Sequence, residues 1–135
     1  PPLGEQILAM TAHIVFDAID PHRPATQSPV VIEEVIRGLI GYRGLLLSDD
    51  LSMEALAGPI ETRALASLAA GCDLALHCNG KLDELVAVLG NVPELPDDQY
   101  RKLQGLAPAG AADPVALDEV LAELTARLGH GVTGV

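Results

Sequence analysis

Basic residues are scarce in this sequence, and long hydrophobic runs are absent from it. Eight Lys and Arg stand against nineteen Asp and Glu, which gives a formal net charge of −11. This sign argues against nucleic acid, whose phosphates are neutralised by Lys and Arg, and against an anionic membrane surface. The apolar runs, such as residues 44–47, are far shorter than the ~20 residues of a membrane-spanning helix. No basic segment followed by an apolar one marks a secretory signal.

Cysteine is also rare, with only Cys72 and Cys78. If the intervening segment is a strand, its six residues place the two about 20 Å apart at ~3.3 Å each, whereas a disulfide needs Cα atoms within about 7 Å. We therefore expect two buried free thiols and a reducing, cytoplasmic location. Because no CxxC motif or histidine-rich cluster accompanies these cysteines, we expect no metal site.

Hydrophobic residues make up 49% of the chain, and their pattern repeats a strand followed by a helix. Apolar runs at residues 7–13, 45–49 and 74–79 predict short buried parallel strands. Between them, apolar spacing predicts helices over residues 28–41, with Ser28 as N-cap and Gly41 as C-terminal stop, and over 60–70.

A further helix is predicted over residues 82–89, so the pattern holds about three strand–helix units at intervals near 30 residues. A (β/α)8 barrel has eight such units in about 250 residues. We therefore predict an α/β fold in which residues 1–90 form part of a TIM-type barrel. A small open α/β sheet is the alternative, although the glycine-rich phosphate turn of a Rossmann unit is missing.

The character of the sequence changes after residue 90. We expect a C-terminal helical extension over residues 91–135, with a short helix at 97–106 and an amphipathic helix at 116–128. A flexible joint rich in Ala, Pro and Gly is expected near 107–114. Helix packing explains the apolar stripe of the last helix.

Polar residues follow each predicted strand, where parallel α/β folds carry their working groups. If residues 45–49 alternate regularly, Asp49 shares the face of Leu45 and Leu47 and points into the mouth of the barrel. Asp50 then points to the helix layer or caps the turn that begins at Ser52. A carboxylate above an apolar core is costly unless it has partners, and this often marks a working group. That both aspartates are only capping residues remains an open alternative.

Two histidines, His13 and His77, also follow predicted strands. Each is more often structural than catalytic when taken alone. A hydrolase triad of Ser48, His77 and Asp49 is disfavoured because no Gly-x-Ser-x-Gly elbow surrounds the serine. Metal binding by His13, Asp49 and His77 is disfavoured because a helical pair of metal-binding histidines is missing.

Several motifs, in order, resemble the β-N-acetylhexosaminidases of glycoside hydrolase family 3. They are residues 10–16 (MTAHIVF), 19–28 (IDPHRPATQS), 41–53 (GYRGLLLSDDLSM) and 70–80 (AGCDLALHCNG). The resemblance implies a retaining glycosidase on a (β/α)8 barrel that releases terminal β-linked N-acetylglucosamine, with muropeptides of cell-wall recycling in the cytoplasm as substrates. It implies Asp49 as the nucleophile, and no cofactor. We also expect His13 to line the substrate site.

The family's general acid/base histidine, its Lys-His sugar motif and its substrate-gripping arginine have no counterpart in these 135 residues. Since loss of general acid catalysis costs typically 10²–10⁴-fold, we expect this chain alone to be inactive and to need the missing N-terminal part of the barrel as partner. Aromatic residues for sugar stacking are also few, with one Phe, two Tyr and no Trp. Another barrel hydrolase that uses Asp49 as a base, and a non-catalytic fragment for packing or partner binding, remain as alternatives.

Overall fold

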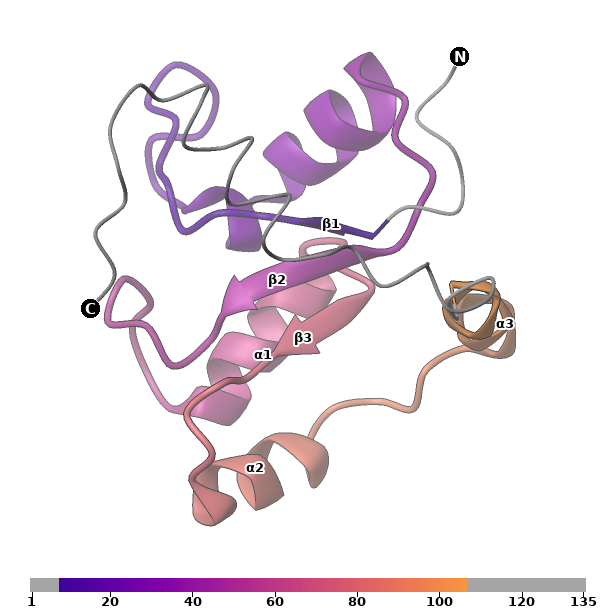
Figure 1. Ribbon diagram of the computed structural model, residues 1–135. Helices are drawn as coiled ribbons and strands as arrows, with labels where there is room; N and C mark the ends of the chain where they lie inside the picture. Colours follow the sequence, from indigo (N-terminus) through magenta and orange to yellow (C-terminus); the bar gives the residue numbers. More distant parts are fainter. Residues whose placement is uncertain (1–7, 107–135) are drawn as a thin grey trace, which may run out of the picture.

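Three short parallel strands form the centre of the computed structural model, which describes residues 8–106 (Figure 1). The strands β1 (Ala9–Met10), β2 (Leu46–Asp50) and β3 (Leu74–Leu76) lie side by side in chain order. Both neighbouring pairs are parallel, as in strand–helix–strand units. The predicted parallel α/β sheet is therefore confirmed, with shorter first and third strands than expected.

Helices connect and follow these strands. Between β1 and β2 lie a 3₁₀ turn, η1 (Ala25–Gln27), and a longer helix, η2 (Val30–Leu39). The helix α1 (Ile60–Ala69) precedes β3 and lies behind β2 and β3 in Figure 1. Two helices follow β3, namely α2 (Leu82–Leu89) and α3 (Asp97–Gly105). The helices predicted up to residue 106 are present, and the joint at 107–114 and the helix at 116–128 lie outside the described residues.

Helix η2 is capped as predicted but wound differently. The hydroxyl of Ser28 accepts a hydrogen bond from the backbone N–H of Val31 at 3.2 Å, as an N-cap does. Near its C-terminal end, the N–H of Ile40 donates to the carbonyl of Val35, five residues earlier. This is the π-helical pattern. Apolar spacing indicates which face of a helix is buried but not this offset, so the winding was not predicted.

Two hydrophobic clusters join the sheet to the helices. The first contains Ile32 of η2 and Leu46 of β2, together with Tyr42, Ala70 and Cys72. The second lies around the loop after β2 and is formed by Leu51, Leu56, Ala64 and Val88. Because these clusters involve η2, α1 and α2, the packing of the helices fixes the position of β2 and of the loop that follows it.

Gly71 allows the first cluster to close. Its φ of +113° lies in a region that L side chains rarely adopt, and a Cβ atom there would stand 2.8 Å from Cγ2 of Ile32. Only glycine satisfies both the turn after α1 and this close approach.

Asp73 organises the amino ends of the strands. Its Oδ2 accepts hydrogen bonds from the N–H of Leu46 at 2.8 Å and from Arg37 Nη2 at 2.7 Å, and its Oδ1 accepts from Gln99 Nε2 at 2.7 Å. Arg37 also donates to the carbonyl of Gly44 at 2.8 Å. These contacts tie η2, β2 and α3 together at the end of the sheet that normally serves stability.

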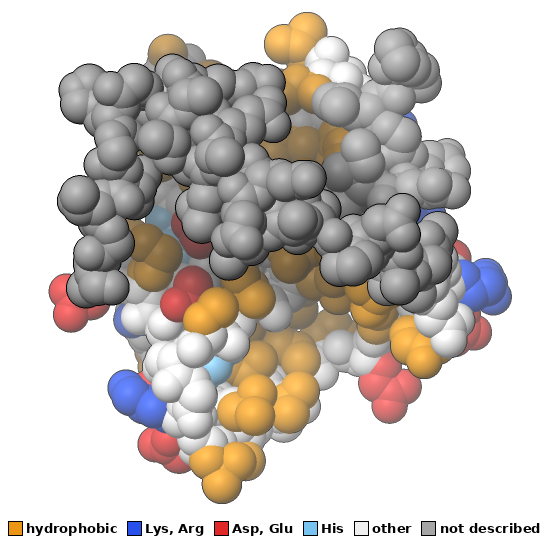
Figure 2. All heavy atoms as spheres, viewed as in Figure 1, with side chains coloured by type: hydrophobic (Ala, Val, Ile, Leu, Met, Phe, Trp, Pro, Cys, Tyr) orange, Lys and Arg blue, Asp and Glu red, His pale blue; other side chains and the backbone are white. Residues whose placement is uncertain are grey.

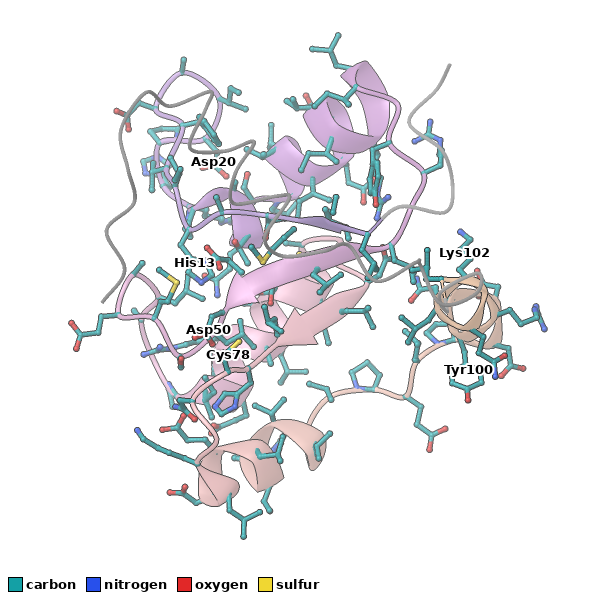
Figure 3. All side chains as sticks on the ribbon, viewed as in Figure 1. His13, Asp20, Asp50, Cys78, Tyr100 and Lys102 are labelled. Carbon is teal, nitrogen blue, oxygen red and sulfur yellow. The ribbon has the colours of Figure 1, made fainter. Side chains whose placement is uncertain are left out.

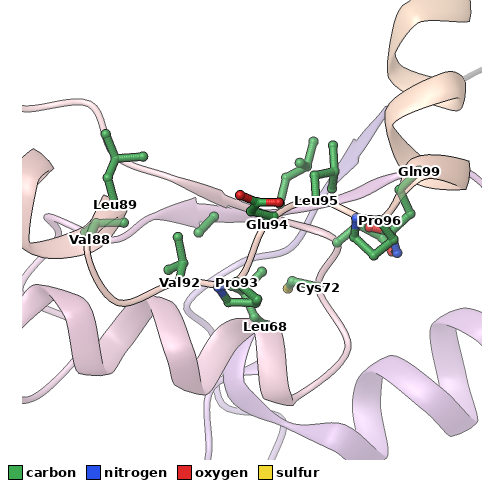
Figure 4. A pocket seen from close by; sticks show the side chains of 13 residues that line it. Leu68, Cys72, Val88, Leu89, Val92, Pro93, Glu94, Leu95, Pro96 and Gln99 are labelled. Atoms are coloured by element: carbon green, nitrogen blue, oxygen red, sulfur yellow. The ribbon is translucent and has the colours of Figure 1, made fainter.

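The surface over α2 is apolar. Leu82, Val86 and Leu89 are 72%, 61% and 66% exposed, and Figure 2 shows hydrophobic side chains gathered there. Beside β3 lies a hollow of about 310 Å³, lined mainly by apolar side chains that include Leu68 and Val92 (Figure 4). Among residues 8–106, no helix has the length and apolar character to cross a membrane.

The two cysteines are both free, but they differ in exposure. Cys72 is buried, and burial raises the pKa of its thiol to about 11. Cys78 is exposed, so the expectation of two buried thiols was wrong for this residue. The strand β3 ends at Leu76, which places Cys78 in the loop beyond it.

Candidate functional site

The carboxyl ends of the three strands gather polar side chains from separate parts of the sequence. Figure 3 shows His13, Asp50 and Cys78 near one another at the arrowhead end of β2. Tyr100 and Lys102, on α3, lie on the other side of the molecule. The predicted candidates at the ends of the first two strands therefore share one region with the loop after β3.

The strand β2 is irregular where Asp49 lies. Leu47 pairs with Leu74 and Asp50 pairs with Leu76, so Ser48 and Asp49 together face a single residue of β3. Such an extra residue is a β-bulge, a feature often found next to active sites. Regular alternation of side chains does not continue through a bulge. Alternation therefore no longer supports the predicted orientation of Asp49, and the contacts of its side chain have to be considered instead.

Asp50 is fully engaged by backbone and hydroxyl donors. Its Oδ1 accepts from the N–H of Ser52 at 3.0 Å and from the N–H of Cys78 at 3.1 Å, and its Oδ2 accepts from Ser52 Oγ at 2.6 Å. Burial alone would raise the pKa of Asp50, but the hydrogen bonds from Ser52 and Cys78 outweigh it and lower the pKa below 3.8. Asp50 caps the turn after β2, as predicted, and also ties that turn to the loop after β3.

Asp49 is much less constrained. Among the described residues, its half-buried carboxylate accepts one hydrogen bond, from the N–H of Asp50 to Oδ1 at 2.8 Å. Its other oxygen, Oδ2, has no protein donor within residues 8–106. Among residues 8–106, both oxygens of Asp50 therefore have a protein donor, whereas Asp49 has one oxygen without one.

His13 binds protein groups through both ring nitrogens. Its Nε2 lies 2.9 Å from the carbonyl oxygen of Asp50, and its Nδ1 lies 2.9 Å from Oγ1 of Thr26. Since a carbonyl only accepts hydrogen bonds, Nε2 carries a proton and donates it. The hydroxyl of Thr26 also lies 2.9 Å from that of Thr11. Thr26 was not singled out from the sequence, because its separation of thirteen residues from His13 follows no helix or strand period.

His77 is turned toward the helix that follows it. Its Nε2 lies 3.0 Å from Glu84 Oε2, which also accepts from Asn79 Nδ2 at 2.6 Å, while Lys81 donates to Oε1 at 2.9 Å. Hydrogen bonds from His77, Lys81 and Asn79, in that order, lower the pKa of Glu84 to about 2. Glu84 was another residue that the sequence alone did not reveal.

The disfavoured alternatives are not assembled in this geometry. The hydroxyl of Ser48 accepts from the N–H of Leu76 at 2.8 Å, whereas His77 binds Glu84, so the two do not form a nucleophile–base pair. Within residues 8–106, no group of three His, Cys, Asp or Glu side chains is placed to hold a metal ion.

Comparisons with known proteins agree on one family. Residues 5–102 match the family model described as the glycosyl hydrolase family 3 N terminal domain. The β-hexosaminidase of Alkalilimnicola ehrlichii is 50% identical over 90 residues, which are 65% of this chain and 25% of that protein. The β-hexosaminidase of Bordetella avium is 41% identical over 111 residues, which are 79% of this chain and 28% of that protein.

Solved structures give the same result. A structure of NagZ from Neisseria gonorrhoeae in complex with N-trifluoroacetyl-D-glucosamine matches with a TM-score of 0.62 and 28% identity, covering 87% of this chain and 32% of that one. A family 3 β-N-acetylglucosaminidase from Paenibacillus matches with a TM-score of 0.60 and 30% identity, covering 82% of this chain and 24% of that one. The chain thus spans about a quarter to a third of the length of these relatives.

Proposed function

Because the chain belongs to glycosyl hydrolase family 3, we propose that it supplies the nucleophile, Asp49, of a retaining β-N-acetylhexosaminidase. The observation that carries this proposal is the contrast between two neighbouring carboxylates. Asp50 accepts three hydrogen bonds from Ser52 and Cys78, whereas Asp49 accepts one and keeps Oδ2 available among residues 8–106.

The proposed reaction has two steps on one carboxylate. First, an oxygen of ionised Asp49 attacks the anomeric carbon, and the bond from that carbon to the leaving oxygen breaks. The leaving oxygen takes a proton from a general acid, and the sugar stays bound to Asp49 as an ester. Water then attacks the same carbon and gives its proton to the group that served as the acid, while the bond from that carbon to Asp49 breaks, which frees the sugar and restores the carboxylate. The N–H of Asp50, 2.8 Å from Oδ1, donates to this carboxylate and orients it.

We further propose that residues 1–90 are the C-terminal part of a (β/α)8 barrel and that residues 91–135 form a helical extension. The general acid/base and most sugar-binding groups would come from an upstream part of a longer protein, which fits the share of its relatives that this chain covers. The substrate class would be saccharides with terminal β-linked N-acetylglucosamine, with muropeptides of cytoplasmic cell-wall recycling as the natural source. His13 would form part of the wall of the site.

Covalent trapping tests the proposal. The full-length enzyme is treated with an activated fluoro-sugar that carries an N-acetyl group, and the labelled peptide is located by mass spectrometry. We expect the label on Asp49, in wild type and in Asp50→Asn, and no label in Asp49→Asn. Initial product formed with the β configuration, followed by NMR, would support retention. A label elsewhere, or an inverted product, would overturn the assignment.

The isolated 135-residue chain provides a second test. Strands β1 and β3 are the two edges of the described sheet, and unpaired strand edges recruit other chains. We expect the isolated chain to associate in size-exclusion chromatography and to leave an aryl N-acetylglucosaminide uncleaved. A stable monomer that cleaves this substrate unaided would show that the acid/base lies within the chain.

A further inference from the structure

We infer that His13 is a positioning residue for Asp49, and that it acts through the backbone of Asp50 rather than through the substrate. This inference rests on the proposed role of Asp49. Its starting point is the bulge in β2, because the carbonyls of Leu47 and Asp50, which flank the bulge, contact side chains of other segments.

The backbone ladder between β1 and β2 stops before it reaches Asp49. The paired residues are Ala9 with Leu46 and Met10 with Leu47, and the last backbone contact is the N–H of Thr11 with the carbonyl of Leu47 at 2.9 Å. Beyond this point, the carbonyl of Asp50 accepts from Nε2 of His13 at 2.9 Å instead. A side chain thus takes the place of a strand hydrogen bond next to Asp49.

His13 is itself held by two buried hydroxyls. Thr26, with 0% exposure, binds Nδ1 of His13 and contacts Thr11, which is 6% exposed. The hydroxyl of Thr11 in turn lies 3.2 Å from the carbonyl of Leu47. The hydrogen-bond chain therefore begins and ends on β2, at the carbonyls of Leu47 and Asp50, and it brackets the bulge that contains Asp49.

One donor in this hydrogen-bond chain is fixed by its acceptor. Nε2 of His13 must donate to the carbonyl of Asp50, because a carbonyl only accepts, whereas the contacts of Thr26 with Nδ1 and with Thr11 can run in either direction. Both ring nitrogens are then occupied by protein groups. No polar atom of the ring is left to bind a sugar hydroxyl, which separates a positioning role from a direct role in substrate binding.

The position of the Asp49 carboxylate matters for the rate. The attacking oxygen has to lie about 3–3.5 Å from the anomeric carbon and in line with the bond that breaks, and a shift of about 1 Å can lower the rate about 10²-fold. Asp49 and Asp50 share a peptide group, and the N–H of that group also binds Oδ1 of Asp49. The Asp50 carbonyl belongs to the next peptide group, on the other side of the Asp50 Cα. Releasing this carbonyl from His13 therefore frees Asp50 to shift, and with it the N–H that binds the Asp49 carboxylate.

Two substitutions separate the two ring contacts. In full-length enzyme, His13→Gln can still reach the carbonyl of Asp50 with its amide N–H, because Gln extends about as far as Nε2. His13→Asn extends only about as far as Nδ1, so it can bind Thr26 but not Asp50. The matched control is His22→Asn, since the side chain of His22 is exposed in the loop before η1.

We expect His13→Asn to lower kcat about 10²-fold with little change in KM, while His13→Gln and His22→Asn stay within a few-fold of wild type. The fluoro-sugar should still label one Asp49 per chain in His13→Asn, only more slowly, which shows that the variant is folded. Three results would each overturn the inference. They are an equal loss of kcat in His13→Asn and His13→Gln, a rise in KM at constant kcat in His13→Asn, and a wild-type kcat in His13→Asn. A wild-type enzyme labelled at another residue would instead overturn the nucleophile assignment, and this inference with it.

Discussion

The adjacent carboxylates of Asp49 and Asp50 should separate catalysis from stability. In full-length enzyme, Asp49→Asn replaces the attacking oxygen, and we expect kcat to fall on the order of 10⁴-fold or more, the scale on which loss of a nucleophile acts in covalent hydrolases. Its unfolding free energy should change little, because the carboxylate of Asp49 accepts a single hydrogen bond within residues 8–106.

Asp50 should show the opposite behaviour, with a magnitude that follows from its three contacts. In Asp50→Asn the amide oxygen can still accept from the N–H groups of Ser52 and Cys78, and the Ser52 hydroxyl can turn to accept from the amide. Only the charge is then lost, and since charge-assisted bonds are about twice as strong as neutral ones, the cost is about 1–2 kcal/mol. Asp50→Ala removes the acceptors entirely, and we expect about 2–4 kcal/mol.

Urea unfolding followed by circular dichroism gives the stability, and release of an aryl leaving group gives the rate. Both Asp50 variants should retain turnover at temperatures where they are folded, with Asp50→Ala the less stable of the two. The reasoning would be refuted by an Asp49→Asn enzyme that turns over normally, or by an Asp50→Asn enzyme that is inactive yet as stable as wild type.

Three further outcomes are expected. Gly71→Ala should lower the unfolding free energy by about 2–5 kcal/mol in urea titrations, because backbone strain and overpacking add. Gly58→Ala is the control, because Gly58 has a φ of +88° but open space around its Cβ. Equal losses in the two variants would exclude a contribution from the close contact at Gly71. Iodoacetamide at pH 8 should label Cys78 and spare Cys72, whose pKa is about 11, as read by peptide mass mapping; fast labelling of Cys72 would contradict its burial. The pKa of Glu84 is lowered to about 2, so the stabilisation by its ionised form is complete above pH 4.5 and is lost as the pH falls from 4.5 toward 2. Glu84→Gln should therefore flatten the dependence of Tm on pH in that range. An unchanged profile would argue against the contact with His77.

Hydrophobic patterning was sufficient to predict the three parallel strands and the helices between them. Strand and helix periods are short-range properties, so a single sequence carries them. Ser28 as a helix cap and Asp50 as a turn cap were predicted for the same reason, because each bonds within three residues of itself. The barrel itself remains a prediction, since the sheet of residues 8–106 has three strands.

Features that depend on contacts between distant segments were missed. The bulge at Ser48 and Asp49 is defined by the register against β3, which no property of β2 alone reveals. Likewise, the occupation of both ring nitrogens of His13 depends on Thr26 and on the Asp50 carbonyl, thirteen and thirty-seven residues away. Asp49 was predicted as a candidate from motif resemblance and from alternation, and its role stays a prediction.

The two contacts that join β2 to the segment after Leu74 also couple the site to local opening of the fold. The N–H of Leu76 binds Ser48 Oγ, and the N–H of Cys78 binds Asp50 Oδ1, so the residues on both sides of Asp49 depend on the docking of β3. A fluctuation that detaches β3 would release both neighbours at once, without unfolding the rest of the molecule. Amide hydrogen exchange at Leu76 and Cys78 would then report, in the absence of any ligand, the fraction of time in which Asp49, the proposed nucleophile, is held in place.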